Sequence, residues 1–116
     1  MMQAIGEGYE LLERGPFDLD LAEVSKVYAN GSVIRSWLVA LTLEAIAEDS
    51  KLEKFTGKVA HSGEGEWTVN FAEKLGINVP VIKSSLAARI KSWENPSYGS
   101  KVVSAMRYGF GRHKEA

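Results

Sequence analysis

The sequence contains no cysteine, only two histidines and no long apolar run, and each of these absences excludes a class of protein. Without cysteine there is neither a disulfide framework nor a thiolate metal ligand, which is compatible with a reducing cytoplasm, where we expect the protein. The histidines form no H-E-x-x-H pattern, so the sequence predicts no metal site. Glu44 and Glu48 limit the most apolar stretch, well short of the about 20 residues of a membrane span.

The chain also lacks a strong excess of charge of either sign. Its formal net charge is −1, so no overall field would attract nucleic acid. Its first residues contain no basic segment followed by an apolar one, and hence no signal peptide is expected. With 116 residues, 45% hydrophobic and 25% charged, the chain is long enough for one globular domain with a modest core.

No alternating strand pattern is present, and the apolar periodicity is helical throughout. The β-branched run 77–82 contains Pro80, which would break a central strand. The sequence therefore predicts an all-α fold, a bundle of about six helices joined by short connections. Apolar residues at helical spacing mark the first helix, which Gly15-Pro16 ends; they are Met2, Ile5, Tyr9 and Leu12.

Capping residues delimit the remaining helices. Asp20 is predicted to cap the second, and Asn30-Gly31 to end it. Ser32 is predicted to cap a long helix over 33–49, whose dense apolar residues suggest the central core helix with Arg35 in its first turn. After one or two helical turns over 51–55, the expected helices are 69–75, capped by Thr68 and ended by Gly76; 81–93, with Pro80 at its start; and 98–110, capped by Ser97.

Residues 61–68, HSGEGEWT, admit three interpretations: a phosphate-binding glycine loop, an acid/base site, or the turn before a helix. A dinucleotide fingerprint would need a third glycine and a preceding strand, and a Walker loop would need Gly-Lys-Ser/Thr. Neither is present. The residues by themselves favour a turn in which Gly63 and Gly65 relax the backbone.

Three cationic side chains stand out. Arg89 lies within the apolar stripe of its helix, where an arginine usually extends to solvent or pairs with a carboxylate. Arg107 and His113 flank a glycine-bearing stretch near the C-terminus, and such a cluster is most often a solvated tail. All three could instead meet an anion. No nucleophile and base occur at a readable spacing, so no catalytic residue is predicted.

Several segments, taken together and in order, resemble the C-terminal helical domain of the 6-phosphogluconate dehydrogenases, most closely the shorter, bacterial-type branch. They cover nearly the whole chain and read MMQAIGEGYELL, NGSVIRSWL, SGEGEWT with the following LGINVPVI, SLAAR, and RYGFGRH. The resemblance implies a single domain over residues 1–116 that binds substrate and forms a homodimer. The expected core helix and the tail would supply the dimer contacts.

The resemblance also implies the family's reaction, the oxidative decarboxylation of 6-phosphogluconate to ribulose 5-phosphate with NAD or NADP. In the family a Rossmann domain holds the cofactor, and a lysine and a glutamate in a K-x-x-H-N-G-I-E-Y segment perform the acid/base steps. Neither occurs within these 116 residues. We therefore expect this chain to bind no cofactor and to be inactive alone.

The site residues implied by the resemblance are Arg89, Arg107 and His113. Arg89 matches the family's arginine at the substrate phosphate. Arg107 and His113 match residues that reach across the dimer into the partner's substrate site. Longer family members have K-G-T-G where this chain has Ser62 and Glu64, so the roles of these two stay open. Glu64 would either contact sugar hydroxyls or hold an arginine.

Two other functions remain compatible with the sequence. The chain could be a stand-alone helical interaction module whose basic residues serve solubility or docking. It could also be a domain of a related β-hydroxyacid dehydrogenase that acts on a different acid.

Overall fold

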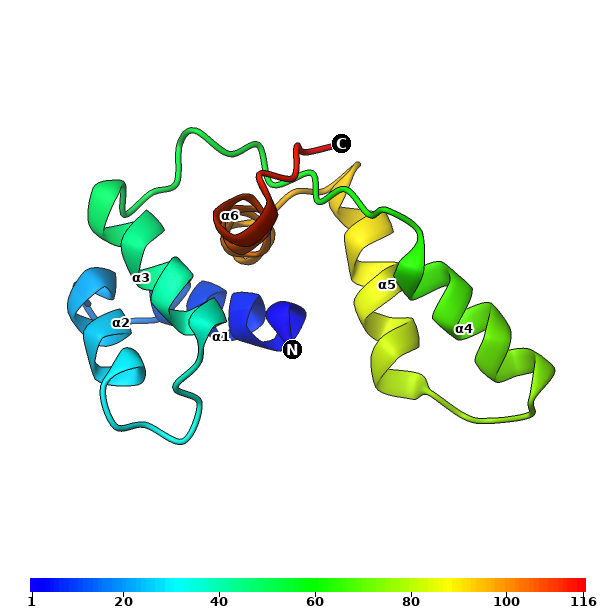
Figure 1. Ribbon diagram of the computed structural model, residues 1–116. Helices are drawn as coiled ribbons and strands as arrows, with labels where there is room; N and C mark the ends of the chain where they lie inside the picture. The colour runs from blue at the N-terminus through cyan, green and yellow to red at the C-terminus, as the bar shows by residue number, and fades with distance from the viewer.

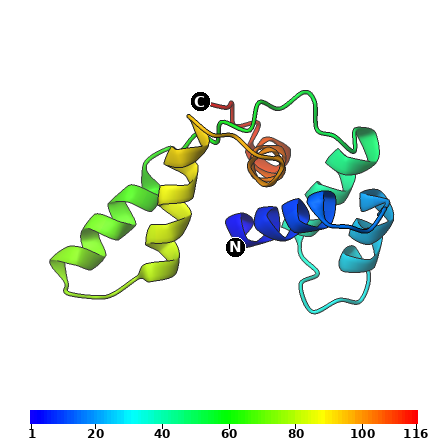
Figure 2. The ribbon, with the colours of Figure 1, turned by 180° about the vertical axis from the view of Figure 1, so that it is seen from behind.

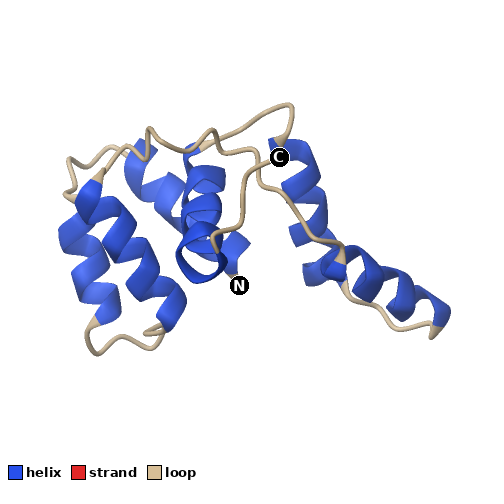
Figure 3. Cartoon of the chain, turned by 45° about the horizontal axis from the view of Figure 1, so that its top comes forward, coloured by secondary structure: helices blue, strands red, loops and turns tan.

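The computed structural model describes all 116 residues and contains six α-helices and no strand, which confirms the predicted all-α fold. The helices are α1 (Met2–Arg14), α2 (Leu21–Ala29), α3 (Trp37–Glu48), α4 (Glu64–Lys74), α5 (Pro80–Ser92) and α6 (Tyr98–Gly111). None of them is long and apolar enough to cross a membrane. Helices and connecting loops account for the whole chain (Figure 3).

The helices form two parts. One is a body of α1, α2, α3 and α6, in which α6 packs against α1 and α3, and α2 packs against α3. The other, the α4–α5 hairpin, extends away from this body, as the views from the front and from behind both show (Figures 1 and 2). Its two helices pack mainly against each other. This division leaves the hairpin attached to the body chiefly through the segments at its base.

The central helix of the body is α6, and the prediction that helix 33–49 would be central is wrong. Eight of the nine residues 99–107 of α6 are buried, and Val102 and Met106 are fully so. Helix α3 buries one face but leaves Trp37 66% exposed. Some of the apolar residues of 33–49 therefore lie on the surface and not in the core. The small residues of α6, which gave a weaker apolar signal, let other helices approach it closely.

Helix α3 also begins later than predicted, because Ser36 caps it and Ser32 does not. The Ser36 hydroxyl accepts a hydrogen bond from the Val39 N–H at 3.3 Å. The Ser32 hydroxyl instead donates to the Tyr28 carbonyl at the end of α2. Residues 32–35 form the turn between the helices, so Arg35 precedes α3 and is not in its first turn.

The other predicted boundaries are confirmed, except for the Thr68 cap and the helical turns expected over 51–55, both described below. The Asp20 carboxylate caps α2 by accepting from two backbone N–H groups, and Asn30 follows its last residue. Helix α1 ends before Gly15, Gly76 follows the end of α4, and Pro80 is the first residue of α5. These caps are local interactions, which explains why the sequence alone revealed them.

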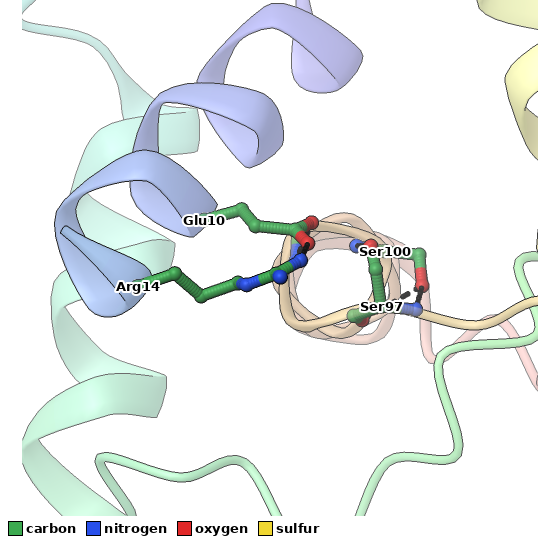
Figure 4. Close-up of polar contacts among 5 residues, drawn as sticks. Glu10, Arg14, Ser97 and Ser100 are labelled. Carbon is green, nitrogen blue, oxygen red and sulfur yellow. Dashed lines mark hydrogen bonds and ion pairs between the residues drawn. The ribbon is translucent and has the colours of Figure 1, made fainter.

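The N-terminus of α6 is held by its own cap and by α1. Ser97 caps α6 as predicted, and it also forms a reciprocal capping box with Ser100 (Figure 4). Glu10 of α1 accepts a hydrogen bond from the Gly99 N–H at 3.1 Å and one from Arg14 at 3.3 Å (Figure 4). Burial alone would raise the pKa of the Glu10 carboxyl, but Ser97, Gly99 and Arg14 hold it below its ordinary value.

The connection between α3 and α4 contributes to the core although it is not helical. Residues 51–55 form turns in place of the predicted helical turns, and an extended segment follows up to α4. Leu52, Phe55 and Val59 are buried and belong to the same apolar cluster as α6. The connection is thus fastened to the body before it leads into the hairpin.

Candidate functional site

Helix α4 begins inside the HSGEGEWT segment, four residues before the predicted cap. Gly63 is the N-cap, with a left-handed backbone (φ 107°), and the Trp67 N–H bonds to its carbonyl at 2.9 Å. A Cβ at Gly63 would lie 3.0 Å from the Trp67 ring, so glycine suits this position for two reasons. The prediction that Thr68 caps the helix is wrong. Its hydroxyl donates to the Glu64 carbonyl, one turn earlier, at 2.7 Å.

No side chain caps the N-terminus of α4. The N–H groups of Glu64, Gly65 and Glu66 precede the first residue that can bond back within the helix, so they lack helical acceptors. Together with the helix dipole, such groups favour an anion at this end of the helix. The segment therefore offers backbone donors, while its two glutamates add negative charge beside them.

Two arginines lie near this helix start, Arg89 near the end of α5 and Arg107 in α6. Arg107 is buried, with 7% of its surface exposed, and Arg89 is half-buried. Burial lowers the pKa of both guanidinium groups, and the charge of Arg89 lowers the pKa of Arg107 further. Buried arginines that repel each other are costly unless an anion compensates them.

Neither arginine forms an ion pair. All five ion pairs of the chain lie elsewhere and involve more exposed lysines or Arg14. Glu64 is the nearest source of negative charge, since it opposes the lowering of the pKa of both Arg89 and Arg107. It acts at longer range than an ion pair. The guanidinium donors of both arginines are therefore free to bind a ligand.

The Glu64 carboxylate interacts electrostatically with Arg89, Arg107 and His113. Its pKa lies below the ordinary value, first because of the Ser62 hydroxyl and the backbone at its own position, and also because of Arg107 and His113. Glu64 therefore affects the predicted site residues through space without forming an ion pair with either arginine. The largest lowering of the pKa of this carboxylate comes from the Ser62 hydroxyl.

His113 follows α6 in the C-terminal tail, residues 112–116. Its ring packs edge-on against Phe110, with 5.5 Å between ring centroids, and it remains exposed. The charge of His113 also lowers the pKa of Glu64, so the two side chains lie within electrostatic range of each other. The structure thus places Arg89, Arg107 and His113 of one chain within electrostatic range of Glu64. We call these four residues the basic cluster.

Glu115 anchors the tail, a role that no sequence pattern indicated. Its carboxylate accepts hydrogen bonds from the Thr56 N–H (2.8 Å), the Thr56 hydroxyl (2.9 Å) and the Gly57 N–H (2.7 Å). The Ala116 N–H adds a bond to the Lys58 carbonyl at 2.9 Å. The C-terminus consequently runs beside the connection that leads to α4 (Figure 1). No local pattern could reveal contacts between residues almost sixty positions apart.

The histidine of the HSGEGEWT segment has a packing role. The His61 ring stacks on Trp93 with an interplanar angle of 2° and 5.7 Å between centroids. Its buried Nδ1 has no hydrogen-bond partner. Trp93 is fixed in turn by a bond from its Nε1 to the Val59 carbonyl at 2.8 Å. Nothing in this arrangement pairs His61 with a nucleophile, so the acid/base interpretation gains no support.

In the basic cluster Glu64 and His113 are exposed, whereas Arg89 is half-buried and Arg107 is buried. The principal hollows of the chain are elsewhere, and two of them, of about 420 and 580 Å³, are lined by acidic residues such as Glu13, Asp18 and Glu7. An anion would be repelled there and attracted to the basic cluster. The described residues contain no group of three or more side chains suited to a metal ion. Charge and free donors therefore favour anion binding at the cluster.

The sequence matches the family described as "6-phosphogluconate dehydrogenase, C-terminal domain" over residues 1–108. Arg89 and Arg107 lie within the matched range, whereas His113 and Glu115 lie beyond it. The match spans all six helices up to the last turn of α6.

Curated relatives carry names of the same kind. The protein YqeC of Bacillus subtilis (strain 168), named provisionally as a 6-phosphogluconate dehydrogenase, is 49% identical over 113 residues, which cover 97% of this chain and 38% of YqeC. The NAD(+)-dependent, decarboxylating 6-phosphogluconate dehydrogenase of Haloferax volcanii is 45% identical over 117 residues, covering 100% of this chain and 39% of the relative. A Lactococcus lactis enzyme is 31% identical over 98% of this chain and 26% of its own length.

The chain therefore spans less than two fifths of the length of these relatives. The B. subtilis and H. volcanii proteins are more similar to the chain than the L. lactis enzyme is. The chain also covers a larger share of these two proteins, so they are the shorter ones. This agrees with the predicted resemblance to the shorter branch.

Proposed function

The chain belongs to the family of 6-phosphogluconate dehydrogenase C-terminal domains, and we propose that it is the substrate-binding and dimerising domain of such an enzyme. The whole enzyme would oxidise and decarboxylate 6-phosphogluconate to ribulose 5-phosphate in the cytoplasm. NAD or NADP would bind to another part of the polypeptide. Only the complete enzyme would catalyse the reaction.

The observation that carries this proposal is the pair of unpaired arginines beside an uncapped helix start. Arg89 and Arg107 present planar sets of N–H donors that match the oxygens of a phosphate. The N–H groups of Gly65 and Glu66 at the start of α4 add a third set of donors. With Glu64 included, the basic cluster has a net positive charge, which suits a phosphate dianion.

In 6-phosphogluconate the phosphate is on C6, while the carboxylate that leaves as carbon dioxide is C1. Binding at the basic cluster would therefore hold the end of the substrate remote from the reacting carbons. Binding energy at such a remote group can orient the reacting end for chemistry. His113 would contribute one further hydrogen bond to the phosphate, and Glu64 would face the sugar hydroxyls or the arginines.

Titration calorimetry of the chain with 6-phosphogluconate tests this proposal. We expect binding that gluconate, which lacks the phosphate, does not reproduce. Arg89→Ala and Arg107→Ala should each weaken binding about tenfold or more, because each removes charge-assisted hydrogen bonds. Lys91→Ala, an exposed change on α5, should have little effect. Equal binding of gluconate and 6-phosphogluconate would assign the site to a non-phosphorylated acid.

The proposed partner is a second copy of the chain. Apolar side chains that are each more than half exposed recur every four residues along α4 and at its C-cap; they are Trp67, Phe71 and Leu75. They form an apolar stripe on the projecting hairpin, on the same helix whose start binds the anion. A symmetric dimer would bury this stripe on both copies.

A further inference from the structure

The C-terminal tail contains the site residue His113, and only a few contacts attach this tail to the body. Arg112 ends α6 with a left-handed backbone (φ 52°), and its N–H bonds to the Tyr108 carbonyl at 2.8 Å. Its guanidinium lies over the Tyr108 ring, 4.8 Å from the centroid. The next polar contacts of the tail with the body are those of Glu115 and Ala116. His113 lies between these two fixed points.

We propose that Glu115 is a positioning residue for substrate binding, which ties the tail to Thr56 and Gly57 and so holds His113 at the basic cluster. This inference rests on the proposed function, because it assigns His113 a contact with the substrate phosphate. It assigns Glu115 no contact with substrate.

The geometry supports a specific attachment. Both carboxylate oxygens of Glu115 are used: one accepts from the N–H and the hydroxyl of Thr56, and the other accepts from the Gly57 N–H. Hydrogen bonds to an ionised acceptor are about twice as strong as those between neutral groups. Burial alone would raise the pKa of the Glu115 carboxyl, but the groups of Thr56, Ser104 and Gly57 hold it below its ordinary value. Glu115 is therefore ionised at neutral pH.

The acceptor segment of this attachment is itself fixed. Gly57 packs so closely against α6 that a Cβ there would lie 2.7 Å from the Ser100 hydroxyl. Two residues later, the Val59 N–H bonds to the Ser92 hydroxyl at 3.0 Å, and Val59 is buried. The same segment then leads to Gly63 and the start of α4. Glu115 consequently joins the tail, with His113, to the segment that carries the backbone donors of the anion site.

The test uses the two histidines as separate probes, because an imidazole NMR spectrum of this chain contains only the signals of His61 and His113. In ligand-free protein, Glu115→Gln should increase the fast motion of residues 112–116 in backbone relaxation measurements and shift the His113 signal. The His61 signal should not change. Glu53→Gln, an exposed glutamate in the same connection, is the matched control and should leave both signals in place.

Binding of 6-phosphogluconate provides the second measurement. Glu115→Gln should raise the Kd about fivefold, as His113→Asn does, because each removes one hydrogen bond to the phosphate. The double variant with His113→Asn should show no further loss, whereas the loss should add to that of Arg89→Ala. This pattern separates positioning of His113 from general destabilisation, which would weaken every contact.

An unchanged tail and an unchanged Kd in Glu115→Gln would overturn the inference, as would losses that add fully to those of His113→Asn. If the unmodified chain binds no 6-phosphogluconate, the proposed function fails. The attachment of the tail by Glu115 is then decided by the ligand-free relaxation measurement alone.

Discussion

Gly6 of α1 and Gly99 of α6 meet backbone to backbone. A Cβ at Gly6 would lie 2.5 Å from the Gly99 carbonyl oxygen, and one at Gly99 would lie 2.7 Å from the Gly6 carbonyl oxygen. Side chains at either position would therefore force the two helices apart. The same crossing brings Glu10 to the Gly99 N–H. The position of α6, and with it Arg107, depends on this close approach.

Gly6→Ala should destabilise the protein by about 2 kcal/mol or more, because overpacking at a backbone contact cannot relax through a side chain. Gly8→Ala in the same helix is the matched control. Nothing lies within 4 Å of a Cβ at Gly8. There alanine should stabilise the helix by about 0.5–1 kcal/mol. Urea unfolding of both variants measures the difference, and equal effects would contradict the close helix crossing.

Arg107→Met should abolish 6-phosphogluconate binding without loss of stability. The buried arginine has no ion-pair partner in the chain, so a methionine of similar length removes an uncompensated charge. We expect the free energy of unfolding to stay the same or to rise by about 1 kcal/mol. Calorimetric titration and urea unfolding provide the two measurements. A marked loss of stability would show that Arg107 serves the fold instead.

Stability should fall in acid, in part through Glu10 and Glu115. The pKa of each carboxyl is lowered in the folded protein from its ordinary 4.5. Each therefore stabilises the fold above the unfolded pKa, and this contribution is lost as the pH falls through the folded pKa. Urea unfolding between about pH 7 and pH 3 should show this loss below about pH 4.5. Glu10→Gln and Glu115→Gln should each flatten the profile, and Glu53→Gln should flatten it less.

Phe71→Glu should convert a dimer to a monomer, because it places charges in the centre of the apolar stripe on α4. Phe71 is 63% exposed, so the change removes little from the core. Light scattering gives the mass in solution, and Val27→Glu, at a 67% exposed position on α2, is the control. A dimer that persists in Phe71→Glu would show that another surface forms it. A monomeric unmodified chain would refute the dimer itself.

The correct predictions from sequence concern interactions within a few residues. The Asp20 and Ser97 caps, the end of α1 before Gly15 and the start of α5 at Pro80 each depend on neighbours in the chain. The errors at Ser32 and Thr68 have one cause. In each case a residue nearby is the N-cap instead, Ser36 for α3 and Gly63 for α4. Contacts with the rest of the fold determine which of the possible caps is used.

The candidate site was likewise predicted only in part from the sequence. The resemblance singled out Arg89, Arg107 and His113, and residues from both parts of the fold then met around Glu64. The sequence left open whether Glu64 holds an arginine. In the structure it affects both arginines through space and forms no ion pair with either. Glu115 had no signal in the sequence, because its partners Thr56 and Gly57 are brought to it only by the fold.

The sequence by itself determined the helical class, most helix boundaries and the family, because periodicity, caps and ordered motifs are properties of the chain read in order. The tertiary structure decided which helix is central, where HSGEGEWT becomes helical, and which charges remain unpaired. These depend on how closely distant segments approach, as at Gly6 and Gly99 or at Glu115 and Gly57. Such distances follow from packing of the whole molecule and have no counterpart in local sequence.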